Sequence, residues 1–140
     1  MKHNLILRFI AKFFFPVIAL FALYVQFHGD YGPGGGFQAG VILSVAFIFY
    51  ALVFGMKTTE QVLPLGVLRI LASTGVLIYS GTGIVTMLMG GNFLDYDILS
   101  LRPIQGQHIG IMVIELGVGI TVSAVMLIIF YTFANRENHD

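Results

Sequence analysis

Four long apolar stretches dominate the pattern of hydrophobic and polar positions along the chain. They run from Phe9 to Phe27, from Phe37 to Phe54, from Val67 to Met89 and from Ile109 to Phe133. The segments between them carry the Gly and Pro residues that are typical of turns. Because a helix needs roughly 20 apolar residues to cross the hydrocarbon core of a bilayer, each stretch predicts one membrane-spanning helix. The pattern therefore predicts an all-α, polytopic integral membrane protein with four transmembrane helices, folded as a single domain over residues 1–140.

The composition also indicates that the chain is surrounded by lipid. Of the 140 residues, 57% are hydrophobic and 10% are charged, whereas soluble domains usually carry about 25% charged residues. Seven basic and seven acidic residues cannot give a domain of this size a polar surface, so lipid is the expected surrounding. The net charge is zero and the basic residues form no large cluster, which argues against nucleic acid as a partner.

The basic residues also predict the orientation in the membrane. Loops rich in Lys and Arg tend to stay in the cytoplasm, and only Arg102 falls on the opposite side from the other basic residues. Both termini are therefore expected in the cytoplasm. No small-residue cleavage site follows the first apolar stretch, so we expect this helix to remain in the mature protein. The basic residues on the predicted cytoplasmic side are Lys2, Arg8, Lys12, Lys57, Arg69 and Arg136.

Enzyme chemistry finds little support in the sequence. There is no cysteine, no pair of histidines at zinc-binding spacing and no phosphate-binding loop with its lysine. The predicted orientation divides the histidines between the two sides of the membrane. We therefore expect no enzymatic activity, no metal site and no cofactor in this chain. The histidines are His3, His28, His108 and His139.

The last apolar stretch has two different faces. At about 100° per residue, Glu115 and Gly117 point roughly 160° apart. Helices associate in lipid through close packing of small residues and through interhelical hydrogen bonds, so both faces are expected to meet protein. The third predicted helix also has two small or polar faces. Because four helices cannot cover every such face from within, we expect the chain to be a subunit that docks on partner membrane proteins, with a homo-oligomer as the alternative. One face carries Gly106, Gly110, Gly117, Thr121 and Ala124, and the other carries His108, Glu115 and Gly119.

Glu115 is the most informative candidate for chemistry. It lies roughly two turns inside the last predicted helix, where an unpaired carboxylate costs several kcal/mol, so it must be protonated, paired or hydrated. One interpretation is a carboxyl group that exchanges protons or binds Na⁺. The other is a side chain that only forms hydrogen bonds between helices.

Four further residues are candidates: His108 for the proton path, and His28, Asp30 and Arg69 as weaker ones. His108 lies two turns outward of Glu115, about 10 Å away by helix rise, so it fits either a water-bridged proton relay or an interfacial position. His28 and Asp30 lie at the outer end of the first predicted helix, where they could attract cations or only solvate a turn. Arg69 lies just inside the third helix and can reach the lipid headgroups.

A glycine-rich run precedes the second predicted helix. Gly34-x-Gly36-x-x-Ala39 matches a dinucleotide-binding pattern, but that pattern requires a βαβ unit and here the run joins two apolar helices. Glycine lets the backbone approach its neighbours closely. We therefore expect a re-entrant or tightly packed entry to the second helix that contacts a partner or water. The run is Pro33-Gly34-Gly35-Gly36-Phe37-Gln38-Ala39-Gly40.

This run, followed by Gly106-Gln107-His108 and by Ile114-Glu115-Leu116-Gly117, resembles the B subunit of the Mrp-type multisubunit Na⁺/H⁺ antiporters. The resemblance covers nearly the whole chain in length, helix number and motif order. It implies a complex of several different hydrophobic subunits in the bacterial plasma membrane, which exchanges Na⁺ for H⁺ and in which the partners are subunits of the A, C, D, E, F and G types. The residues that match the family's motifs are Pro33, Gly34, Gly35, Gly36, Phe37, His108 and Glu115.

By the same resemblance, the large A and D subunits carry the main proton path. The B subunit is non-catalytic, supports assembly and contributes at most part of the ion route. Two alternatives stay open. The chain could belong to the membrane arm of an ion-pumping hydrogenase, which predicts co-purifying iron–sulfur or nickel subunits. It could also be a purely structural scaffold, in which case substitutions of Glu115 and His108 leave transport intact.

Overall fold

The computed structural model describes residues 5–29 and 34–136, and all regular structure in these ranges is helical. Four of the helices are long and apolar enough to cross a membrane. The prediction of an all-α protein with four transmembrane helices is therefore confirmed. The elements are α1 (Leu5–His28), α2 (Gly36–Phe54), α3 (Met56–Val62), α4 (Leu65–Leu88), the short 3-10 helix η1 (Tyr96–Leu99) and α5 (Pro103–Arg136).

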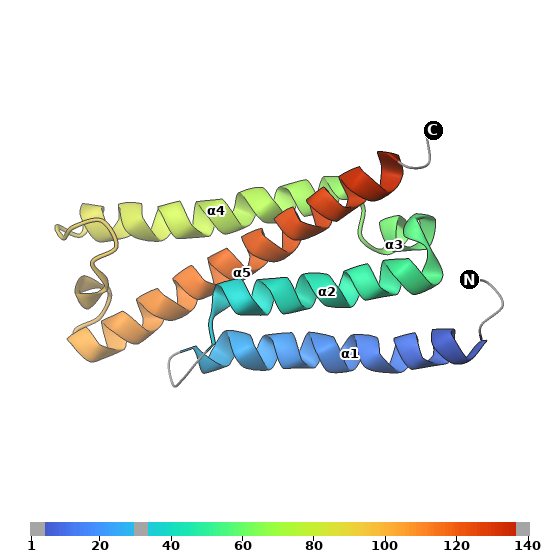
Figure 1. Ribbon diagram of the computed structural model, residues 1–140. Coiled ribbons are helices and arrows are strands. Elements are labelled where there is room, and N and C mark those ends of the chain that lie inside the picture. The colour runs from blue at the N-terminus through green and yellow to red at the C-terminus, as the bar shows by residue number, and fades with distance from the viewer. Residues whose placement is uncertain (1–4, 30–33, 137–140) are drawn as a thin grey trace.

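The long helix α5 holds the bundle together. It crosses obliquely between α2 and α4 and packs against both, while α1 packs mainly against α2 (Figure 1). Helices α2 and α5 run in the same direction, and α4 runs opposite to them. The beginning of α1 and the end of α5 lie at the same end of the molecule (Figure 1), which the prediction of two termini on one side requires.

Helix α5 begins earlier than the hydropathy pattern predicts, at Pro103 rather than at Ile109. Proline is favoured in the first turn of a helix, where its missing N–H would have no partner. With 34 residues, α5 is about 51 Å long, which exceeds the hydrocarbon thickness of about 30 Å. Its first turns are covered by η1: a Cβ built on Gly110 would overlap the Tyr96 ring, and Gln107 Nε2 donates a hydrogen bond to Asp97 Oδ1 at 2.7 Å.

A second difference lies between α2 and α4, where the sequence suggests only a loop. Gly55, with φ of 94°, ends α2, and the short helix α3 follows it. Two side chains from the end of α5 attach to this region. The Tyr131 hydroxyl donates a hydrogen bond to the Leu63 carbonyl oxygen at 3.1 Å, and Asn135 Nδ2 donates one to Glu60 Oε1 at 2.8 Å. Helix α3 is therefore part of the bundle at the end opposite to η1.

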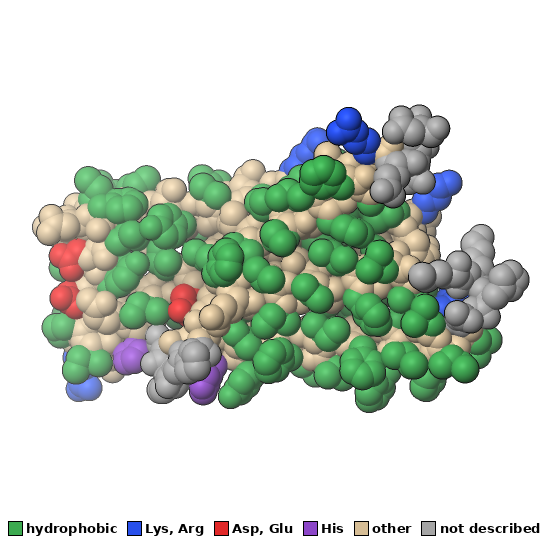
Figure 2. Space-filling view, viewed as in Figure 1, with side chains coloured by type: hydrophobic (Ala, Val, Ile, Leu, Met, Phe, Trp, Pro, Cys, Tyr) green, Lys and Arg blue, Asp and Glu red, His purple; other side chains and the backbone are tan. Residues whose placement is uncertain are grey.

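The buried hydrophobic cluster lies at this same end. It joins the first turns of α4 to the last turns of α5 and consists of Leu68, Ala124, Leu127 and Tyr131. The remainder of the bundle has little interior of its own, and many large apolar side chains on α1, α4 and α5 are exposed. Figure 2 shows hydrophobic side chains along the whole visible face, with most Lys and Arg side chains at the end where α1 begins and α5 ends.

Replacing Tyr131 by phenylalanine should lower the free energy of unfolding by about 1 kcal/mol, because the Leu63 carbonyl loses its hydroxyl donor. The thermal unfolding of the detergent-solubilised protein measures this change. Tyr24→Phe is the matched control, since Tyr24 is 59% exposed. Equal unfolding temperatures for the two variants would contradict a stabilising role for the Tyr131 hydroxyl.

Candidate functional site

The carboxyl group of Glu115 lies against the connection between α1 and α2. A Cβ atom built on Gly29, directly after α1, would lie 2.6 Å from both Oε1 and Oε2 of Glu115. A Cβ atom built on Gly35, directly before α2, would lie 3.1 Å from Oε1. The carboxyl group from α5 thus occupies space that the missing side chains leave open. We call the described glycines of this connection the glycine turn: Gly29, Gly34, Gly35 and Gly36.

The backbones of α2 and α5 meet next to this turn. A Cβ atom on Gly36 would overlap the carbonyl oxygen of Glu115, and a Cβ atom on Gly40 would lie 2.7 Å from the carbonyl oxygen of Gly119. The contacts recur at a four-residue spacing on both helices, the arrangement that small residues permit between membrane helices. This close approach brings the Glu115 side chain to the start of α2.

The conformation of the turn itself requires glycine at one position. Gly35 has φ of 131°, in the left-handed region that residues with a Cβ rarely adopt. Its N–H donates a hydrogen bond to the Val25 carbonyl oxygen at 3.2 Å, which ties the start of α2 back to the last turns of α1. The Glu115 carboxyl group therefore faces a turn that is fixed at both ends.

The position at the start of α2 also suits a carboxylate electrostatically. The first N–H groups of an α-helix have no partner within the helix, and the partial positive charge at this end favours an acidic group. Helix α2 begins at Gly36, beside Glu115. The chain thus supplies a polar surrounding that offsets part of the cost of placing a carboxyl group inside a membrane span.

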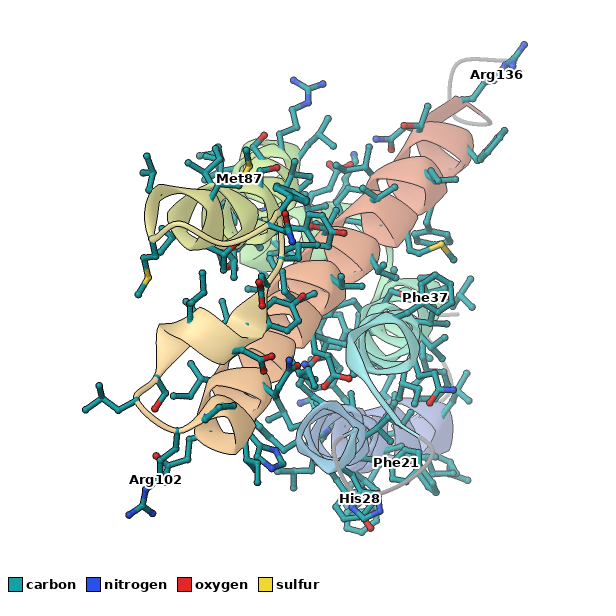
Figure 3. The ribbon with its side chains drawn as sticks, turned by 90° about the vertical axis from the view of Figure 1, so that its left-hand side faces the viewer. Phe21, His28, Phe37, Met87, Arg102 and Arg136 are labelled. Atoms are coloured by element: carbon teal, nitrogen blue, oxygen red, sulfur yellow. The ribbon has the colours of Figure 1, made fainter. Side chains whose placement is uncertain are left out.

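The carboxyl group also borders an open groove. The groove has a volume of about 340 Å³, and Glu115 on its wall is only partly buried. Phe37 lies at its rim with an exposed side chain that points away from the bundle (Figure 3). The groove leaves the carboxyl group accessible from outside this chain. The lining residues are Gly34, Gly35, Gly36, Phe37, Gln38, Ile114, Glu115 and Val118.

The other residues proposed from the sequence lie at different distances from this site. His108 is on the same helix two turns outward of Glu115 and is exposed. His28 ends α1, and its ring stacks on that of Tyr24 with centroids 5.2 Å apart, on the side of α1 that faces away from α5 (Figure 3). Arg69 is exposed near the beginning of α4, at the opposite end of the molecule. Pro33 and Asp30 lie outside the described residues.

Two neighbours of the site escaped the sequence analysis. Gly29 contacts the Glu115 carboxyl group, as described above. Gln26 of α1 places its Oε1 against Gly119, one turn beyond Glu115 on α5. A polar residue within the first apolar stretch was a signal that could have identified Gln26. No group of three or more His, Cys, Asp or Glu side chains within residues 5–29 and 34–136 could hold a metal ion.

Comparison with known proteins gives one consistent result. The family described as "Domain related to MnhB subunit of Na+/H+ antiporter" matches residues 6–128. Proteins named "Putative antiporter subunit mnhB2" from the Newman, JH1 and Mu3 strains of Staphylococcus aureus are each 36% identical to this chain over 142 residues. The match covers 99% of this chain and 100% of each relative.

Proposed function

The chain belongs to the MnhB-related family of Na⁺/H⁺ antiporter subunits, and from this premise we propose that it is a non-catalytic subunit of a multisubunit cation/proton antiporter. It lies in the bacterial plasma membrane with both termini in the cytoplasm. Its partners are the A, C, D, E, F and G types of subunit, and Na⁺ and H⁺ are the exchanged ions. It supports assembly of the complex and contributes Glu115 to the ion pathway.

The observation that carries the ion-handling role is the position of the Glu115 carboxyl group on the wall of an open groove. A carboxyl group used only for packing would be enclosed between helices. Acidic side chains within membrane spans mark ion routes by default, because their desolvation is costly and they are therefore rare where function does not require them. The groove gives protons and cations access, and the start of α2 gives the carboxylate form a favourable surrounding.

The assembly role rests on the helix faces that this chain leaves uncovered. Helix α4 exposes the polar residues Arg69, Ser73 and Thr74 together with large apolar side chains such as Ile70 and Leu77. The Ser73 and Thr74 hydroxyls donate hydrogen bonds to carbonyl oxygens of their own helix, so it is the small size of these side chains that favours close contact with another helix. These faces are the expected contact surfaces for the other subunits of the antiporter.

Glu115→Gln tests the ion-handling role. The amide keeps the shape of the side chain but cannot release a proton, so Na⁺-driven proton exchange in inverted membrane vesicles should fall at least about tenfold. The amount of this subunit in the purified complex should not change. Glu60→Gln is the matched control, since the amide oxygen can still accept the hydrogen bond from Asn135.

Wild-type exchange in the Glu115→Gln complex would eliminate a role for Glu115 in ion handling. Loss of the subunit from the complex would instead assign Glu115 to packing. The control variant Glu60→Gln should exchange ions and assemble at wild-type levels.

A further inference from the structure

We infer that Gly29 is a positioning residue for Glu115, and this inference rests on the proposed function. The absent side chain at position 29 provides the space in which the carboxyl group lies. It therefore sets where that group stands between the start of α2 and the groove. Glycine is needed at position 29 to leave room for the carboxyl group, and not to allow a particular backbone conformation of the turn.

The atoms nearest to the space beside Gly29 belong to one chemical group. The three nearest atoms to a Cβ built on Gly29 all belong to the Glu115 carboxyl group: Oε1 and Oε2 at 2.6 Å and Cδ at 2.9 Å. The φ angle of Gly29 lies outside the left-handed region, so φ does not exclude alanine at this position. The contact with Glu115 is therefore what glycine accommodates at this position.

Among the other members of the glycine turn, Gly35 also faces the Glu115 carboxyl group, since a Cβ there would lie 3.1 Å from Oε1. In all three, however, a side chain would disturb the backbone. A Cβ on Gly34 would lie 2.9 Å from the Val25 carbonyl oxygen, and Gly35 is fixed by its positive φ. A Cβ on Gly36 would overlap the backbone of Glu115. Substitution of these three disturbs the backbone, whereas substitution of Gly29 acts on the carboxyl group.

A methyl group at position 29 should therefore displace the carboxyl group without unfolding the turn. The carboxyl group is at the end of a flexible side chain, which can move by rotation about its own bonds while the backbone of the turn stays in place. Aspartate at position 115 is one methylene shorter and leaves room for the added methyl group. The two substitutions, Gly29→Ala and Glu115→Asp, should consequently compensate for each other.

A double-substitution cycle in the complete antiporter complex tests this inference. Gly29→Ala should lower Na⁺-driven proton exchange at least about tenfold, since a displacement of roughly 1 Å at a functional group can cost about a hundredfold, while the subunit stays in the complex. Glu115→Asp should lower exchange in the wild-type background but raise it in the Gly29→Ala background. Gly81→Ala is the matched control for the labelling experiment on the carboxyl group, because a Cβ there meets no other part of this chain within 4 Å.

The rate at which a hydrophobic carbodiimide labels Glu115, measured by mass spectrometry, reports the carboxyl position independently of transport. Gly29→Ala should change this rate severalfold. An unchanged rate, wild-type exchange by Gly29→Ala, or a double variant no more active than Gly29→Ala alone would each overturn the inference. If Glu115→Gln is inactive while Gly29→Ala is fully active, only the positioning role fails. Full activity of Glu115→Gln would refute the proposed function itself.

Discussion

Replacing Gly36 by valine is expected to remove this subunit from the antiporter complex and to abolish cation/proton exchange. A Cβ at position 36 would overlap the carbonyl oxygen of Glu115 and would lie 2.7 Å from its carbonyl carbon and 3.0 Å from its Cα. These atoms belong to the backbone of α5 and cannot move without the helix. Helices α2 and α5 must therefore separate, which also opens the contact between Gly40 and Gly119.

The expected cost is about 3 kcal/mol or more, at the upper end of what overpacked interiors show when the backbone has to shift. The amount of subunit in the membrane and its co-purification with the partner subunits measure the effect. Gly36→Ala should give the same defect in a weaker form. The thermal unfolding of the detergent-solubilised subunit should show the same defect, with Gly81→Val as its control, since this change adds the same side chain where no other part of this chain lies within 4 Å. Normal assembly of the Gly36→Val complex would contradict a backbone contact between α2 and α5.

The spans themselves could be predicted from the sequence because lipid imposes one simple requirement. Every stretch long enough to cross the hydrocarbon and apolar enough to enter it became a helix. Helical spacing also separated the two faces of α5 correctly. Gly117 and Thr121 meet Gly75 on α4, whereas Glu115 and Gly119 meet Gly36 and Gly40 on α2.

Hydropathy could not predict the ends of the helices or the short elements. The segment 103–108 is too polar to be predicted as part of a membrane span. It is nevertheless helical, because α5 continues beyond the hydrocarbon and η1 packs over it. Helix α3, with the sequence Met-Lys-Thr-Thr-Glu-Gln-Val, is likewise short and polar. Its position depends on tertiary contacts from Tyr131 and Asn135, which no local pattern encodes.

The candidate site was only partly accessible from the sequence. Glu115 stood out as an acid within an apolar run, and the run from Pro33 to Gly40 stood out as a cluster of turn residues. Nothing in the sequence indicated that the two meet. Their contact depends on α2 and α5 lying side by side in the same direction, and Gly29 gains its importance only from that arrangement.

Replacing Gly75 by valine is the second substitution with a large expected effect. A Cβ on Gly75 would overlap the Thr121 hydroxyl oxygen and would lie 2.6 Å from the Gly117 carbonyl oxygen and 2.9 Å from the Thr121 nitrogen. Helix α4 would have to move away from α5, and the cluster around Leu68 and Leu127 would open with it. We expect the free energy of unfolding to fall by about 3 kcal/mol or more and little subunit to remain in the complex. The amount of subunit in the membrane and its co-purification with the partner subunits measure this effect.

The two glycine substitutions should differ in the complexes that still assemble. Gly75→Val acts on the α4 side of α5 and leaves the glycine turn and the Glu115 carboxyl group in place, so its few assembled complexes should exchange ions at the wild-type rate per complex. Gly36→Val moves the backbone of Glu115 itself, and its residual complexes should be inactive. Equal activity per complex in the two variants would mean that the contact between α2 and α5 has no part in ion exchange, because both substitutions would then act through stability alone.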